Sequence, residues 1–402
     1  MDSHNLALPQ PAGVEFRRET LCRSGSTGDN WCITWAGDGA QYTSMCDGNW
    51  LGGEHKYHNH LYRIPGQPED LRVEDVPGYP QFVQGTGSWF GYGIVSSGGV
   101  LYSAISKTPG NRWSGPFRGL KLLASRDGGA TWARIDRRGL ERVIEPWAEA
   151  RNEVSADEMF FLEECGHPHR EQPAYPFSYV SFVQCGRDNT AARDDYTYIH
   201  SPEGAQSHQL LLARAPKHQI GVRDAWEYFV RYDDDGHPMW SPDLRERGPV
   251  HLFPERSGDD RYFGWYSWLP SVVWNEPLGL YIMANGGTYA GCGMTSSDED
   301  YYDAWMHERT GSLGFWYAHA PWGPWRQFFY TDYWTVDDAG NRTYQPKLSP
   351  KWISDDGRRM VLIWSDAMRN EDGRSHTVNY RWNQMEIELA LAEQETGCAA
   401  GQ

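Results

Sequence analysis

The chain has 402 residues, 39% hydrophobic and 23% charged, so it can bury a large core and is unlike a disordered chain. Its formal net charge of −17 repels nucleic-acid phosphates and anionic membrane surfaces, and we expect neither nucleic acid nor a membrane as partner. Aromatic residues make up 14% of the chain and 43 glycines supply turns, which favours many short strands.

Strand and turn signals recur along the chain in five groups. In the first group, two strand-like runs flank Asp38-Gly39, a strong hairpin signal. The later groups repeat a similar plan of strand, turn and strand at intervals of tens of residues. The groups begin near residues 33, 89, 176, 265 and 344. The repeats predict an all-β fold, a five-bladed β-propeller with long inter-strand insertions.

The predicted propeller is a single domain that spans residues 14–391. Residues 14–21 have the pattern of a strand and could close the ring against the last blade, which would remove an open sheet edge. Residues 137–175 and 288–310 lack clean strand patterns and are expected to be insertions, the second partly helical. Flexible tails are expected at 1–13 and 392–402.

One local motif is specific. The segment 125–132, Ser-Arg-Asp-Gly-Gly-Ala-Thr-Trp, matches the Asp-box of propeller hairpins. Asp127 can accept backbone N–H groups across a tight turn, and Trp132 can fill the space between strands. We predict a structural role for this motif.

The cysteines and the N-terminus place few limits on compartment. The seven cysteines include no Cys-x-x-Cys pair, so a zinc ribbon has no support. Cys32 and Cys46 fall on neighbouring predicted strands, where either a disulfide or two buried thiols would fit. The first residues lack the pattern of a signal peptide, and no run approaches the ~18 apolar residues that span a bilayer. Localisation and oligomeric state stay open.

A binding site in a propeller is expected where the innermost strands converge, with residues from every blade. Aromatic side chains stack on sugar rings, and polar side chains bond sugar hydroxyls. The alternative is that the aromatic residues pack between blades, and that Arg187 and Asp366 form ion pairs between blades. The predicted substrate-binding residues are Trp31, His58, His60, Trp89, Tyr92, Tyr175, Arg187, Trp265, Tyr266, Ser267, Tyr344, Gln345 and Asp366.

Two aspartates are the predicted catalytic residues. Hydrolysis of a glycosidic bond needs one acid for the leaving oxygen and a second carboxylate that acts on water or on the anomeric carbon. Asp29 precedes the first predicted strand and Asp47 ends the second, so the hairpin between them brings both to the same rim. Structural capping is the alternative role. The prediction requires no cofactor and leaves room for a structural calcium ion.

The segment His55 to His60 contains three histidines, which raises the alternatives of a metal site, a substrate contact or ordinary packing. His58 and His60 alternate and are expected to share one strand face. No other histidine cluster completes a zinc site, and no metal ligand is predicted. Motifs of acyl transfer, dinucleotide binding and phosphate binding are absent from the sequence.

The block Thr27-Gly28-Asp29-Asn30-Trp31 and the block Met45-Cys46-Asp47-Gly48 resemble the opening of a family of bacterial and phage propellers that includes endo-D-arabinanases. In that family one aspartate precedes the first strand and a second lies at the end of the next. Asp29 and Asp47 stand in similar places. The resemblance implies a five-bladed propeller glycoside hydrolase with these two catalytic carboxylates, and it leaves the sugar open.

Two other functions remain as alternatives. The first is a polysaccharide lyase that would use His58 or His60 with Tyr92 as proton carriers and Arg187 to neutralise a uronate. The second is a propeller that binds carbohydrate without cleaving it. The partner is a carbohydrate in all three cases.

Overall fold

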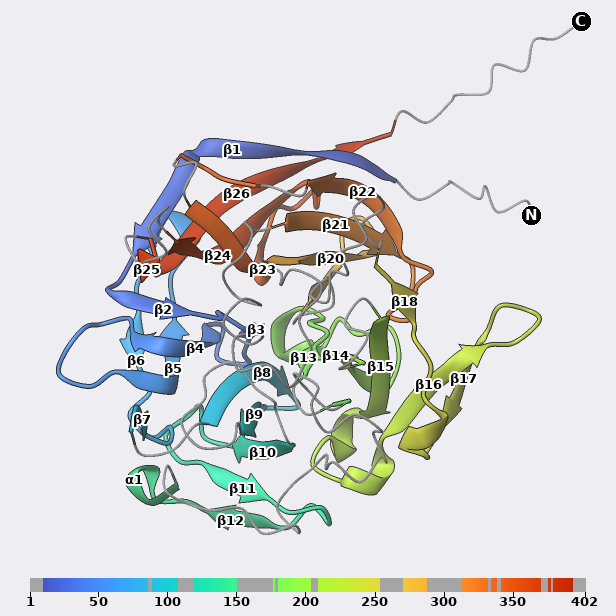
Figure 1. The fold of residues 1–402 in the computed structure, drawn as a ribbon. Coiled ribbons are helices and arrows are strands. Elements are labelled where there is room, and N and C mark those ends of the chain that lie inside the picture. Colours follow the sequence, from blue (N-terminus) through green and yellow to red (C-terminus); the bar gives the residue numbers. More distant parts are fainter. Residues whose placement is uncertain are drawn as a thin grey trace, which may run out of the picture.

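The computed structural model describes residues 10–85, 89–107, 119–149, 176–177, 180–203, 209–253, 270–287, 312–331, 334–337, 341–369, 375–376 and 379–392. Five antiparallel sheets surround a common centre, so the predicted five-bladed propeller is confirmed (Figure 1). In the described residues the one α-helix is short, α1 (Pro146–Glu149). None of the described helices is long and apolar enough to cross a bilayer.

The first two blades follow the chain from the centre outward. Blade 1 contains β2 (Thr27–Asp29), β3 (Ile33–Trp35), β4 (Gln41–Asn49), β5 (Tyr57–Ile64), β6 (Glu74–Asp75) and β7 (Phe82–Val83). Blade 2 contains β8 (Trp89–Ser97), β9 (Val100–Lys107), β10 (Leu120–Ser125), β11 (Ala133–Ile135) and β12 (Glu141–Val143).

The remaining blades repeat this arrangement. Blade 3 contains β13 (Ser181–Phe182), β14 (Tyr196–Pro202), β15 (Gln209–Pro216), β16 (Glu227–Tyr232), β17 (Pro238–Ser241) and β18 (His251–Leu252). Blade 4 contains β19 (Ser271–Asn275), β20 (Leu280–Gly287), β21 (Ser312–Ala318) and β22 (Arg326–Thr331). Blade 5 contains β23 (Asn341–Ile353), β24 (Arg359–Arg369), β25 (Ser375–His376), β26 (Trp382–Leu391) and β1 (Pro11–Ser24).

The N-terminal strand closes the ring, as its sequence pattern predicts. β1 pairs antiparallel with β26 and becomes the outermost strand of blade 5 (Figure 1). Val14 and Phe16 of β1 pack against the apolar cluster between blades 4 and 5. The edge of β26 is therefore paired rather than open.

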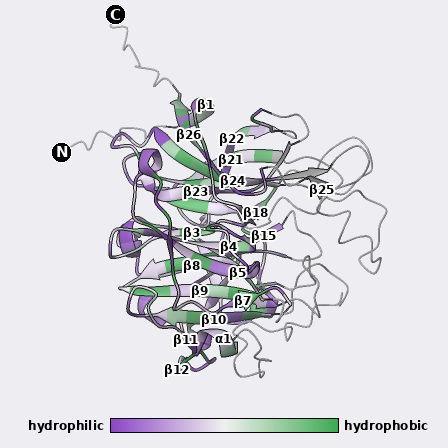
Figure 2. Ribbon diagram, turned by 90° about the vertical axis from the view of Figure 1, so that its left-hand side faces the viewer, coloured by the Kyte–Doolittle hydropathy of each residue, from purple (hydrophilic) through white to green (hydrophobic). Residues whose placement is uncertain are grey.

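Apolar side chains fill the spaces between neighbouring blades. One cluster joins blades 1 and 2, a second joins blades 2 and 3, and others lie between blades 3 and 4, 4 and 5, and 5 and 1. Hydrophobic residues accordingly run along the strands, while many turns are hydrophilic (Figure 2). Burial between sheets uses both faces of each blade, which explains why strands such as β8 and β10 are buried along their whole length.

The Asp-box has the predicted structural role. Asp127 accepts the backbone N–H of Thr131 at 2.9 Å and the Thr131 hydroxyl at 2.6 Å. Gly129 has a φ of +93°, and Trp132 is 1% exposed in the core between blades 1 and 2. The carboxylate is thus committed to the turn after β10.

The fold sets which strand ends share a face. β2, β8 and β23 begin, and β4 and β24 end, on one face of the ring, because neighbouring strands are antiparallel. The turn between β3 and β4 and the turn between β8 and β9 lie on the opposite face.

The predicted helical insertion at 288–310 lies outside the described residues, as do most residues of 137–175.

Candidate active site

Asp29 and Asp47 come together at a β-bulge between β2 and β4. Asp29 lies opposite Cys46, while Thr27 lies opposite Asn49, so β4 carries one extra residue in this interval. Asp47 has a φ of +51°, a left-handed conformation that is uncommon outside glycine. Bulges of this kind re-aim side chains and often occur beside active sites. The hairpin therefore brings both aspartates to one rim, although Asp47 lies within the strand rather than at its end.

The carboxyl group of Asp29 is buried, with 5% of the residue exposed. The hydroxyl of Tyr380 donates a hydrogen bond of 2.7 Å to Asp29 Oδ2. Burial, followed by the charge of Asp47, raises the pKa of Asp29 well above its usual range, and the Tyr380 bond opposes this increase. Asp29 therefore retains its proton to higher pH than an ordinary aspartate.

Asp47 has a more polar and more open environment. Its side chain is 19% exposed, and Oδ1 lies 3.2 Å from Nδ1 of His58 and 3.3 Å from Nε2 of Gln84. Two neighbouring carboxyl groups thus stand in different surroundings: Asp29 is buried and has a raised pKa, and Asp47 is more exposed and has polar side chains beside it.

A small central cavity of about 20 Å³ lies where the five blades meet. Each blade contributes side chains to its wall, and Lys347 of β23 is the basic residue among them. Cys32 in the cavity wall follows Asp29 by three residues, although neither Asp29 nor Asp47 lines the cavity. The lining includes Cys32, Tyr92, Gln184, Ser271 and Lys347.

Two of the tryptophans predicted to bind substrate lie in the core. Trp31 has no exposed surface, packs on Trp50 and Trp382, and donates from Nε1 to Ser365 Oγ at 2.8 Å. Trp89 is 1% exposed and belongs to the cluster between blades 1 and 2. The alternative considered above, packing between blades, applies to both because the large indole ring fills inter-blade space.

Tyr92 and the two histidines lie closer to the expected site. Tyr92 lines the central cavity and is 4% exposed. His58 contacts Asp47, whereas His60 Nε2 lies 2.6 Å from Asp75 Oδ1 of β6 and its ring stacks on Tyr57. The two histidines therefore serve different carboxylates, and His60 belongs to the packing of blade 1.

Arg187 lies at the opposite face from the aspartate pair. Its guanidinium donates to the carbonyl of Gly37, in the turn that joins β3 to β4. The neighbouring Asp188 accepts from Ser96 and from the backbone of Gly99, at the turn between β8 and β9. Arg187 and Asp188 thus link the turns of blades 1, 2 and 3, and the position of Arg187 does not fit the predicted substrate contact.

Asp366 lies inside blade 5, with 2% of the residue exposed. Its Oδ1 accepts from Trp364 Nε1 at 2.9 Å and lies 3.4 Å from the Thr343 hydroxyl. Burial raises the pKa of Asp366 to about 7. The carboxyl group is enclosed within blade 5, its burial costs stability when it ionises, and its contact with substrate stays a prediction.

Replacement of Asp366 by asparagine is expected to stabilise the protein at alkaline pH. The folded protein keeps the Asp366 proton up to about pH 7, whereas the unfolded chain loses it near pH 4, so the wild type loses stability as pH rises between these values. The difference between variant and wild type should approach a few kcal/mol, roughly 4, above pH 7 and vanish near pH 4. Urea unfolding at pH 5 and pH 8 measures it. Asp127→Asn, at an exposed carboxylate whose pKa is lowered, should show no gain at pH 8.

Some of the remaining predicted substrate-binding residues lie outside the part of the chain that the structure describes. Tyr175, Trp265, Tyr266 and Ser267 lie outside the described residues, and for Tyr344 the backbone in β23 is described. Gln345 is 3% exposed and has a φ of +54°, at a bulge in the pairing of β23 with β24. This bulge is at the same face as the aspartate pair.

Sequence reasoning missed four residues around the aspartate pair. Tyr380 and Gln84 lie in loops and carry no local signal of their role, although Lys347 is an unusual cation within an inner strand. Trp147 of α1 is 58% exposed, and its ring lies 5.6 Å from that of His55. His55 precedes Lys56, whose carbonyl accepts from the backbone of Gln84. Trp147 is therefore an exposed aromatic surface on the Asp47 side of blade 1.

In the described part of the chain, one group of side chains could hold a metal ion. Asp233, Asp235 and His237 lie in the exposed hairpin between β16 and β17. Asp233 Oδ1 already accepts the backbone N–H groups of Asp235 and His237, as turn aspartates do. This cluster is far along the chain from the three histidines that the sequence singled out.

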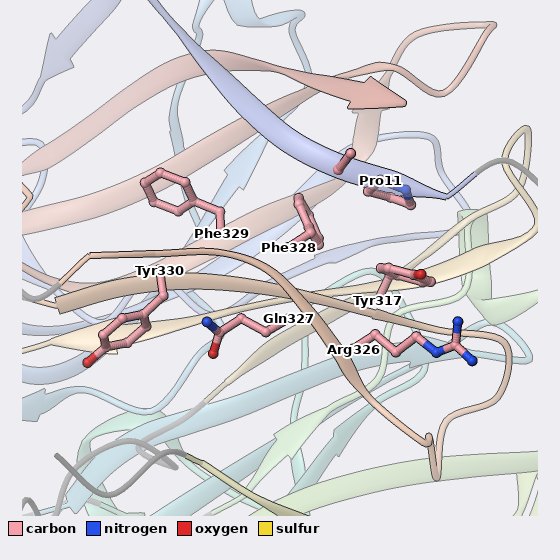
Figure 3. A pocket seen from close by; sticks show the side chains of 8 residues that line it. Pro11, Tyr317, Arg326, Gln327, Phe328, Phe329 and Tyr330 are labelled. Atoms are coloured by element: carbon pink, nitrogen blue, oxygen red, sulfur yellow. The ribbon is translucent and has the colours of Figure 1, made fainter. Parts of the chain in front are cut away.

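A second hollow lies on the outer surface, between the start of β1 and the strands β21 and β22 (Figure 3). Its lining includes Pro11, Tyr317, Arg326 and Phe328. Figure 3 shows these side chains around the crossing of β1 over blade 4. It contains no carboxylate, which separates it from the aspartate pair.

No protein-family model matches the sequence, and no curated protein matches it. Similar solved structures include a putative hydrolase from Bacteroides ovatus (14% identity, 91% of this chain, 87% of that chain, TM-score 0.48). A GH62 α-L-arabinofuranosidase catalytic domain from Coprinopsis cinerea has 10% identity, covers 95% of this chain and 99% of its own, and has a TM-score of 0.42. A Bacillus subtilis arabinanase has 10% identity, covers 92% of this chain and 96% of its own, and has a TM-score of 0.39. All three TM-scores are below 0.5, so these similarities establish no activity for this chain.

Proposed function

We propose that this protein is a glycoside hydrolase that cleaves a glycosidic bond in a polysaccharide or oligosaccharide. The observation that carries the proposal is the pair of Asp29 and Asp47, two adjacent carboxyl groups with opposite surroundings at one face of the ring. Two neighbouring carboxyl groups, one of which has a raised pKa and can donate a proton, are the usual catalytic pair of glycosidases.

The surroundings of the two carboxyl groups support a different role for each. Asp29, buried and with a raised pKa, is the acid that protonates the leaving oxygen. Asp47, bonded to His58 and Gln84, is the carboxylate that acts on water or on the anomeric carbon. Tyr380 fixes one oxygen of Asp29 and so orients its carboxyl group. No cofactor takes part in these steps.

The surroundings of the pair favour an uncharged sugar chain. The net charge of −17 disfavours a polyanionic substrate. Trp147, with His55 beside it, offers an exposed ring for a sugar unit outside the cleaved bond. The sequence resemblance to the family that includes endo-D-arabinanases makes arabinans the first polymers to test.

The two alternatives fit the observations less well. The lyase alternative relies on Arg187 to neutralise a uronate, and Arg187 lies at the other face. A propeller that only binds sugar would have no need of a buried carboxyl group coupled to a second one, because burial of an acid costs stability.

Digestion of a glycan panel tests the proposal. Arabinans, xylans, other neutral polysaccharides and a uronate polymer are incubated with the wild type and with Asp47→Asn. New reducing ends are expected with the wild type on at least one neutral polymer, and a loss of at least about 100-fold with the variant. Equal activity of both proteins, or release of an unsaturated product that absorbs in the ultraviolet, would overturn it.

A further inference from the structure

A lysine side chain is buried at the centre of the propeller. Lys347, in the innermost strand of blade 5, is 2% exposed and lines the central cavity with Cys32 and Tyr92. A lysine is almost never fully buried unless an anionic group is near, because removing an ammonium from water is costly. The position of Lys347 therefore calls for a nearby acid.

The innermost strands offer one acidic residue. β3, β8, β13, β19 and β23 contain neither aspartate nor glutamate in their sequences, and β2 contains Asp29. Cys32, which shares the cavity wall with Lys347, follows Asp29 by three residues. Among the strands that form the channel, Asp29 is thus the residue that can supply the anion.

We propose that Lys347 is the counter-ion of Asp29 at the centre of the propeller and is a positioning residue for the acid of the reaction. This inference rests on the proposed function for its catalytic part. The ammonium favours the ionised form of Asp29, so it eases release of the proton that burial alone would hold too tightly.

Other charged and titratable groups also face the two residues. Asp29 faces Asp47 and Cys46 from β4, Tyr380 from the segment before β26, and the charge of Lys56, whose effect on Asp29 is at least as large as that of Lys347. Burial and Asp47 raise the pKa of Asp29, whereas Tyr380, Lys56 and Lys347 lower it. Burial lowers the pKa of Lys347, and Cys32, Asp29 and Cys46 oppose that decrease. Lys347 is the one cation in this set that is itself buried, since Lys56 is exposed.

Lys347→Met removes the charge and keeps most of the volume. The alkaline limb of the pH profile of kcat/KM, which reports proton loss from the acid, should move up by roughly one pH unit. Lys351→Met is the matched control, because Lys351 belongs to the same strand but contacts the carbonyls of Pro65 and Gly66. Its profile should match the wild type. An unshifted limb in Lys347→Met would overturn the proposal.

A second measurement needs no substrate, and one of its two arms needs no Lys347 variant. In protein labelled with ¹³C at aspartate carboxyl groups, the Asp29 resonance should titrate at higher pH in Lys347→Met than in wild type. In ¹⁵N-lysine-labelled Asp29→Asn, the Lys347 ammonium should titrate at lower pH than in wild type. If neither resonance moves, the two residues are not coupled and the proposal fails. If they move in a protein that cleaves no glycan, the counter-ion relation stands and the proposed function fails.

Discussion

Asp29→Asn is expected to reduce cleavage of natural polysaccharides by about 10²- to 10⁴-fold, the usual contribution of a general acid. The asparagine keeps the size of the side chain and an oxygen that can accept from Tyr380, so folding should be preserved. Aryl glycosides with good leaving groups need little protonation and should still be cleaved. Initial rates on a polymer and on a dinitrophenyl glycoside of the same sugar measure the contrast.

Asp47→Asn provides the complementary result. Because Asp47 is assigned to water or to the anomeric carbon, its loss should impair both substrates equally, and added azide should restore part of the rate on the aryl glycoside. If the two variants showed the opposite pattern, the roles of the two aspartates would have to be exchanged. If neither added azide nor a better leaving group changed the cleavage rate of either variant, Asp29 and Asp47 would not be the catalytic pair.

Trp31→Ala is expected to destabilise the protein by about 3–5 kcal/mol, the range for large aromatic side chains removed from a core. Trp31 joins the first blade to the last, because it packs on Trp382 and donates to Ser365, and Ser365 in turn donates to the Gly28 carbonyl. Urea unfolding followed by circular dichroism measures the free energy of unfolding.

Two further variants separate the contributions of packing and of the hydrogen bond to the stability that Trp31 provides. Trp31→Phe keeps much of the packing and loses the bond to Ser365, so a smaller loss of about 1–3 kcal/mol is expected. Trp147→Ala removes an exposed indole and should change stability by no more than about 0.5 kcal/mol. A loss in Trp31→Ala no larger than that in Trp147→Ala would mean that Trp31 does not hold the ring closed.

Local sequence patterns predicted the architecture well. The turn Asp38-Gly39 marked the first hairpin, the Asp-box marked a turn after β10, and residues 14–21 lay within the strand that completes blade 5. Each feature depends on alternation of side chains and on turn residues that are neighbours in sequence. The adjacency of Asp29 and Asp47 also followed from one hairpin.

The parts that sequence could not predict depend on contacts between distant segments. Tyr380 reaches Asp29 from 351 positions away. The sequence positions of Trp31 and Trp89 predicted contacts with sugar rings. Both faces of a blade are buried against neighbouring blades, however, and both tryptophans lie in the hydrophobic core. Arg187 follows an inner strand, but positive φ values at Gly186 and Asp188 mark a turn that contacts the other face.

A crystal structure of Asp47→Asn with a bound oligosaccharide, of a sugar selected by the digestion panel, would test the aspartate pair most directly. We expect a glycosidic oxygen within hydrogen-bond distance of the Asp29 carboxyl group and the anomeric carbon on the side of residue 47. A sugar bound with full occupancy elsewhere, for example against Tyr317 and Phe328 on the outer surface, with residues 29 and 47 untouched, would contradict the proposal.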